Sequence, residues 1–141
     1  MHIKHWLGLN LSRIKIKALN ATIVWTLFIA FLCGIPGRDI PHISFLELLS
    51  FDKWVHAGIF FILFIFLFKT LYNYSNNLMK ALSLSLISCI LYGILLEIMQ
   101  GLVFIERSAD IFDVIANSTG AIIASWMIFR NKLKRFLNFI E

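Results

Sequence analysis

Residues 82–100, LSLSLISCILYGILLEIMQ, form an apolar stretch in which the only acidic residue is Glu97. The stretch has close to the about 20 residues that an α-helix needs to cross a hydrocarbon core of about 30 Å. Three further stretches are similar: Leu19 to Ile35, Trp54 to Leu71 and Ile111 to Phe129. The 141-residue chain is 60% hydrophobic, with a mean hydropathy of +0.83, which excludes a soluble domain with a polar surface. The sequence therefore predicts an all-α integral membrane protein.

The connections between the four stretches are too short to hold a separate soluble domain. We therefore expect residues 1–141 to form a single up-and-down bundle of four transmembrane helices, at about 19–35, 54–71, 82–100 and 111–129. Basic residues precede the first stretch, as they do in a secretion signal. However, its apolar run is longer than a typical signal segment and no Ala-x-Ala-like cleavage site follows, so we expect the helix to be retained.

The basic residues predict how the bundle is oriented. Ten of the 13 Lys and Arg residues lie in the N-terminal tail, the second loop and the C-terminal tail, and the other three are Arg38, Lys53 and Arg107. Because cytoplasmic loops carry the excess of Lys and Arg, both termini are predicted to be cytoplasmic. The net charge of +5 then reflects topological anchors that also favour anionic lipid head groups, and no nucleic-acid partner is expected.

Three short polar clusters lie at the ends of the apolar stretches, all at the predicted outer face of the membrane. They are Asp52, Lys53 and His56; Glu97 and Gln100; and Arg107, Asp110, Asp113 and Asn117. An ionisable group at membrane depth costs roughly 2.5 to 3.5 kcal/mol on insertion scales, so such clusters indicate a functional site.

Helical spacing places each cluster on one face. Asp52 and His56 are separated by four residues, and Asp113 and Asn117 follow Asp110 by three and seven, with Gly120 continuing the same stripe. Gly93, Glu97, Gln100 and Gly101 form a second small and polar stripe, which is suited to close contact between helices.

Each cluster also has a structural alternative. Asp52 fits an N-cap, and Ser108 could cap a helix in whose first turn Asp110 lies. His56 could be a satisfied buried side chain, Glu97 could bond to a neighbouring helix, and Arg107 could pair with a carboxylate. A purely structural ion-pair network therefore remains open.

Two remaining features concern the outer loop and the cysteines. Ser44 and Glu47 match a capping box, so we expect a short interfacial helix over Ile43 to Leu49. Cys33 and Cys89 lie within apolar stretches, so no disulfide is expected.

In combination, these motifs resemble the VanZ-like family of small bacterial membrane proteins. The resemblance rests on three blocks that keep their order from Phe51 to about Phe129: Asp52-Lys53-x-x-His56, Glu97-x-x-Gln100, and Arg107-x-x-Asp110-x-x-Asp113-x-x-x-Asn117-x-x-Gly120. Ala57 departs from the pattern, in which an aromatic residue follows the histidine. The resemblance implies a multi-pass protein of the bacterial cytoplasmic membrane. It also implies a link to lowered susceptibility to the glycopeptide teicoplanin and to other cell-envelope functions, but no established reaction.

Our first hypothesis is an outward-facing polar pocket that binds or modifies a lipid-linked envelope component, such as a cell-wall precursor or a polysaccharide intermediate. His56, Glu97 and Asp113 are the candidates for acid and base chemistry, while Lys53 and Arg107 would hold phosphate. The alternative is a non-enzymatic accessory subunit whose clusters join the helices. A third interpretation, divalent-cation binding by the acids and His56, lacks a sharper ligand spacing, so no metal and no cofactor are predicted.

Overall fold

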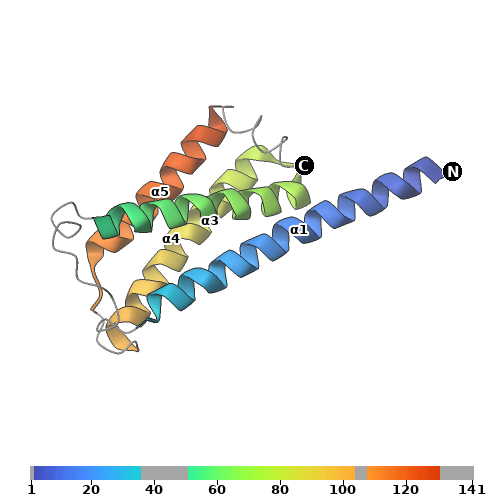
Figure 1. Cartoon of the computed structure of the whole chain (residues 1–141). Helices are drawn as coiled ribbons and strands as arrows, with labels where there is room; N and C mark the ends of the chain where they lie inside the picture. Colours follow the sequence, from blue (N-terminus) through green and yellow to red (C-terminus); the bar gives the residue numbers. More distant parts are fainter. Residues whose placement is uncertain (1, 36–50, 104–107, 131–141) are drawn as a thin grey trace.

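The chain folds into long helices with no strand in the described residues (Figure 1). The structure is a computed structural model that describes residues 2–35, 51–103 and 108–130, with side chains from residue 12 onward. The elements are α1 (His2–Cys33), α3 (Phe51–Ser75), α4 (Leu78–Leu102) and α5 (Ile111–Phe129). Each is long and apolar enough to cross a membrane, which agrees with the four predicted spans.

The helix bounds differ from the predicted ones in three of the four spans. The fourth, Ile111–Phe129, agrees at both ends, whereas the others cover Ser12–Cys33, Phe51–Ser75 and Leu78–Leu102. Hydropathy marks only the apolar part of a helix, and the polar residues that flank this part are helical as well. α1 also ends two residues earlier than predicted, in a turn where the Gly34 N–H bonds to the carbonyl of Ala30. The expected interfacial helix, Ile43 to Leu49, lies outside the described residues.

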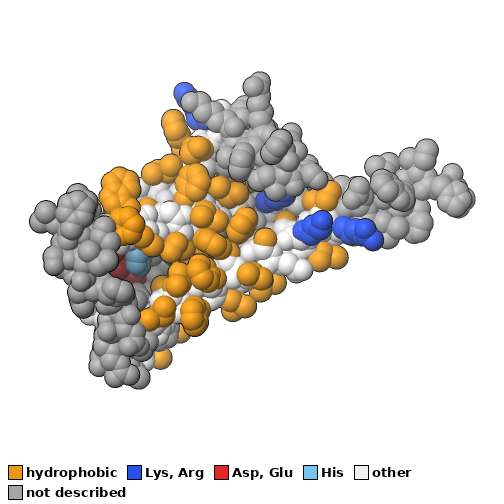
Figure 2. All heavy atoms as spheres, viewed as in Figure 1, with side chains coloured by type: hydrophobic (Ala, Val, Ile, Leu, Met, Phe, Trp, Pro, Cys, Tyr) orange, Lys and Arg blue, Asp and Glu red, His pale blue; other side chains and the backbone are white. Residues whose placement is uncertain are grey.

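α3 is the central helix of the bundle, since it packs against α1, α4 and α5. Its Phe60, Leu63 and Phe64 are almost fully buried, and Ala121 and Ala124 of α5 are completely buried. Most other large apolar side chains face outward and cover the sides of the molecule (Figure 2). Such an apolar exterior suits a lipid environment, in which close packing, rather than removal of apolar surface from water, holds helices together.

A glycine sets the distance between α3 and α5. A Cβ atom at Gly120 would lie 2.0 Å from the carbonyl oxygen of Ala57, so only glycine lets the two backbones approach this closely. Gly93 of α4 has a similar but looser role, because its Cβ would lie 3.4 Å from Asn117. These contacts bring the polar stripes of α4 and α5 against α3.

Polar bonds attach α1 to its neighbours. The hydroxyls of Thr22 and Thr70 lie 2.8 Å apart, and the indole N–H of Trp25 donates to the carbonyl of Ile59 at 3.0 Å. The Tyr92 hydroxyl of α4 donates to the carbonyl of Thr26 at 2.7 Å. Because a membrane interior offers no water as a partner, these bonds favour one position of α1 along α3.

Candidate functional site

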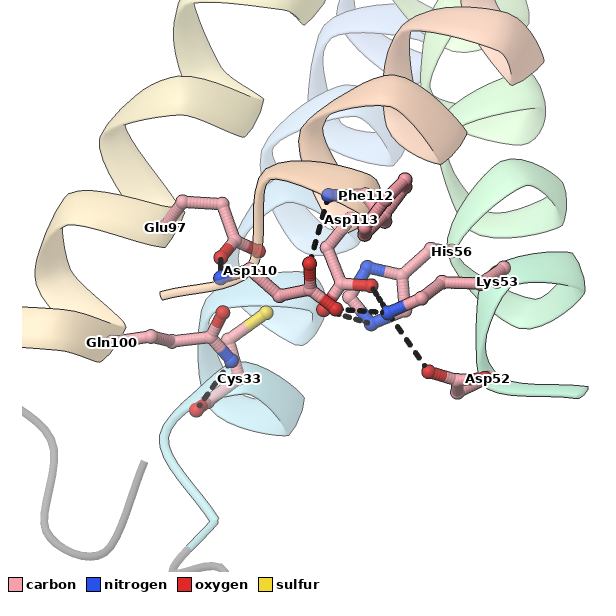
Figure 3. A network of polar contacts seen from close by, with 9 residues as sticks. All are labelled: Cys33, Asp52, Lys53, His56, Glu97, Gln100, Asp110, Phe112 and Asp113. Carbon is pink, nitrogen blue, oxygen red and sulfur yellow. Dashed lines mark hydrogen bonds and ion pairs between the residues drawn. The ribbon is translucent and has the colours of Figure 1, made fainter. Parts of the chain in front are cut away.

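The predicted clusters meet at one end of the bundle, where the first turns of α3 and α5 lie beside the end of α4 (Figure 3). We use the name carboxylate cluster for Asp52, Lys53, His56, Glu97, Asp110 and Asp113. In Figure 2, Asp, Glu and His side chains show at this end, whereas Lys and Arg show towards the opposite end. Residues far apart in the sequence therefore come to one depth, as up-and-down threading predicts.

Lys53 contacts three of the carboxylates in the carboxylate cluster. Its ammonium lies 3.0 Å from Asp52 and 2.6 Å from Asp110, and it also donates to Asp113 Oδ1 (Figure 3). Asp113 is more buried than Asp52 or Asp110, with 16% of its side chain exposed. Lys53 therefore joins α3 to α5 through charge-assisted hydrogen bonds.

Asp110 fixes the start of α5. It is the N-cap, and its Oδ1 accepts the N–H of Phe112 at 2.8 Å. The Asp110 N–H in turn donates to Glu97 Oε2 at 2.9 Å, which ties the end of α4 to the start of α5. Hydrogen bonds from Lys53 and from the Phe112 N–H lower the pKa of the Asp110 carboxyl below its ordinary value. Ser108, the N-cap candidate suggested by the sequence, is therefore not the cap.

A deeper layer contains His56, Glu97 and Asp113, which offer ligand atoms within 4.8 Å of one another. His56 Nε2 lies 3.7 Å from Asp113 Oδ2, beyond the range of a hydrogen bond. Glu97 is buried, with 5% of its surface exposed, although apolar residues precede and follow it in α4. This layer holds the three residues that the sequence suggested for acid and base chemistry.

Gln100 and Asn117 lie further inside. Gln100 Nε2 donates to the carbonyl of Cys33 at 3.4 Å, so it connects α4 to the end of α1 (Figure 3). Asn117 is 3% exposed, and its Oδ1 has no hydrogen-bond partner among the described residues. A buried oxygen without a partner costs about 1–3 kcal/mol, so Asn117 needs an account beyond packing.

A cavity of about 300 Å³ adjoins these residues. Its walls are mostly apolar and come from all four helices, with His56, Gln100 and Asn117 as its polar members. The apolar lining comprises Ile29, Leu32, Val55, Ile59 and Phe60. The cavity is thus amphipathic, and its polar side continues into the carboxylate cluster through His56.

The structure leaves one predicted residue untested and changes the expected role of another. Arg107 lies outside the described residues. Lys53 was expected to hold phosphate, but its ammonium already contacts three carboxylates. The sequence did not reveal the apolar lining, because Leu32 and Ile59 carry no signal that separates a cavity wall from a lipid-facing surface. The contribution of α1 was missed for the same reason.

The described chain has four helices that are long and apolar enough to cross a membrane, and a cavity between them adjoins the carboxylate cluster. These features define the class, which is a small multi-pass membrane protein. Within that class, residues 14–135 match the model of the VanZ/LLP1 family. The chain therefore belongs to this family, which confirms the resemblance noted in its motifs. Comparisons with curated proteins and with solved structures found no match.

Proposed function

We propose that this protein binds a lipid-linked component of the bacterial cell envelope at the cytoplasmic membrane, with the lipid in the cavity and its head group beside His56. VanZ family membership suggests a link to the envelope or to antibiotic resistance, and lowered susceptibility to teicoplanin is the specific form that we propose. The observation that carries the proposal is the amphipathic lining of the cavity.

The apolar walls suit a hydrocarbon chain. Ligand pockets are mostly apolar, with a few placed polar groups, and about 300 Å³ is the lower end of their usual range. This cavity has that composition, because five aliphatic or aromatic side chains surround three polar ones. Its volume suits the segment of a lipid next to the head group, while the rest of the chain would lie in the bilayer.

The polar side of the cavity suits hydrogen bonding to a head group. His56, Gln100 and Asn117 offer an imidazole and two amides within one lining, and the Asn117 Oδ1 still needs a donor. A sugar or peptide hydroxyl or N–H could supply it. Should the protein also modify its ligand, His56 would be the base, and the Asp113 carboxylate, whose Oδ2 lies 3.7 Å from Nε2, would stabilise the protonated imidazole.

Val55→Phe tests the cavity, since Val55 lines it and a larger side chain there would occupy part of its space. Val24→Phe is the matched control, because Val24 is 66% exposed on α1 and does not line the cavity. Both variants would be purified in lipid nanodiscs from a bacterial host, and the bound lipids measured by mass spectrometry. Susceptibility to teicoplanin would be followed in the same strains.

We expect Val55→Phe to lose a bound lipid-linked species, and with it any protection against teicoplanin, at unchanged protein abundance. Val24→Phe should retain both. Equal lipid content in wild type and both variants, at equal abundance, would contradict the proposal.

The second candidate is a non-enzymatic accessory subunit whose polar groups hold the bundle together. One observation favours it: Lys53 binds carboxylates of both α3 and α5. On this alternative, Gln100→Leu should lower stability and function in parallel. On the first, it should lower lipid binding more than it lowers thermal stability.

A further inference from the structure

We infer that His56, Glu97 and Asp113 form a binding site for one divalent transition-metal ion. The sequence did not favour this interpretation, because the three residues lie on three helices and no local ligand motif joins them. The fold brings one ligand atom from each to within 4.8 Å of the others. The inference rests on the described side chains and does not require the proposed lipid ligand.

Among the described residues, the carboxylates of the cluster outnumber its Lys and Arg side chains. Four carboxylates, those of Asp52, Glu97, Asp110 and Asp113, gather around one ammonium, that of Lys53, in the described part of the chain. Lys53 is held by the other three, so the buried Glu97 receives no cation from it. Unpaired charge is expensive away from water, and a divalent ion would compensate it.

The geometry of His56 and Asp113 suits two ligands of one ion. Zn²⁺ bonds to nitrogen and oxygen ligands are about 2.0–2.2 Å long, so two such atoms at ordinary ligand angles lie about 3–3.6 Å apart. His56 Nε2 and Asp113 Oδ2 lie 3.7 Å apart, which is too far for a hydrogen bond and near this spacing. Lys53 meanwhile occupies Asp113 Oδ1, so the carboxylate can bridge the ammonium and the ion.

Glu97 can complete the set. Its Oε2 accepts the Asp110 N–H, and this bond orients the carboxylate at the end of α4. Its other oxygen, Oε1, would then bind the ion. Hydrogen-bonded carboxylates are common metal ligands, because the outer bond holds them in position.

Asn117 is an independent indication of a ligand. It follows Asp113 by one helical turn on the same face of α5, and it lines the same cavity as His56. Its Oδ1 is buried and has no hydrogen-bond partner among the described residues. Water on a metal ion is a strong donor, so it would satisfy this oxygen.

The donor set selects the metal. One imidazole with two carboxylates suits Zn²⁺ or Mn²⁺ better than Ca²⁺ or Mg²⁺, which prefer oxygen ligands alone. Such an ion would also supply what Lys53 cannot, namely a positive charge for an anionic head group at the polar side of the cavity.

The test measures metal alone, without added lipid ligand. The full-length protein in nanodiscs would be stripped with EDTA, dialysed against Zn²⁺ or Mn²⁺ and analysed by elemental mass spectrometry. We expect about one ion per chain, and His56→Gln and Glu97→Gln should each weaken binding about tenfold or more. Glu141→Gln, which removes the same charge from the last residue of the chain, is the matched control and should bind as wild type.

A second measurement needs no variant of the cluster. In wild type carrying Mn²⁺, pulsed electron paramagnetic resonance with ¹⁵N-labelled histidine should show coupling to an imidazole nitrogen. The site would be overturned by the absence of metal above that of empty nanodiscs, or by bound metal with no imidazole coupling. Equal loss of binding in Glu141→Gln and Glu97→Gln would also overturn it. Because no lipid-linked envelope component is added in either measurement, failure here leaves the lipid-binding test of Val55→Phe to stand separately.

Discussion

At the scale of single residues, Lys53 determines how the carboxylate cluster is held together. Its side chain is 28% exposed and contacts one carboxylate of its own helix and two from the start of α5. Exposed ion pairs contribute about 0–1 kcal/mol, whereas breaking a buried pair costs about 3–5 kcal/mol. The partial exposure of Lys53 places it between these limits.

Lys53→Met should therefore destabilise the protein by about 1–3 kcal/mol, because it leaves three carboxylates facing one another. Lys69→Met, near the other end of α3, is the control and should change stability little. Thermal unfolding in detergent, followed by tryptophan fluorescence, measures both. An unchanged midpoint for Lys53→Met would show that the cluster contributes little to the fold.

Asp110 should make the stability of the fold depend on pH in the acid range. Its folded-state pKa is lowered from the ordinary 3.8, chiefly by Lys53, so its ionised form stabilises the fold above that pH. This contribution is lost as the pH falls through the lowered folded-state pKa. The midpoint of thermal unfolding, measured between about pH 2.5 and pH 6, should fall on the acid side less steeply in Asp110→Asn than in wild type. Equal slopes would contradict this role.

At the scale of helices, the contact between α3 and α5 positions the site. Gly120 touches the backbone of α3 one residue after His56, and Asp113 lies two turns earlier on the same helix face. A change in this contact would therefore separate Asp113 from His56 and Lys53. Gly120 is not itself part of the carboxylate cluster. It affects the cluster because it sets how closely α5, which carries Asp113, approaches α3.

Gly120→Ala should destabilise the bundle by about 1–3 kcal/mol, because the added methyl would lie 2.0 Å from a backbone oxygen that has no rotamer to change. Gly58→Ala is a sharp control, since a Cβ there meets nothing within 4 Å. In a helix interior it should be neutral or stabilise by about 0.5–1 kcal/mol. Thermal unfolding of the two variants decides between them, and equal effects would contradict the close approach of α5 to α3.

At the scale of the whole molecule, the open question is which side of the membrane the carboxylate cluster faces. The excess of Lys and Arg in both tails predicts cytoplasmic termini, and the cluster would then face outward. A C-terminal green fluorescent protein fusion should fluoresce in a bacterial host, whereas a C-terminal alkaline phosphatase fusion should be inactive. The opposite pair of results would place the cluster at the cytoplasmic face and exclude extracellular ligands.

The sequence by itself determined that the chain has four apolar helices long enough to span a membrane, and the order of the polar blocks along them. Hydropathy and helical spacing are local properties, and threading alone brings Asp52, Glu97 and Asp113 to one end. It did not determine that α3 begins at Phe51 instead of Trp54, because a helix can continue into polar residues that hydropathy treats as loop.

Only the tertiary structure decided which groups meet. How the helices are rotated and how closely they pack decides three features of the site. These are the pairing of Lys53 with three carboxylates, the approach of His56 to Glu97 and Asp113, and the lining of the cavity by Leu32 and Ile59. Those quantities are set by contacts between distant residues, such as Gly120 against Ala57. Periodicity can say which face of a helix is polar, but it cannot say what that face touches.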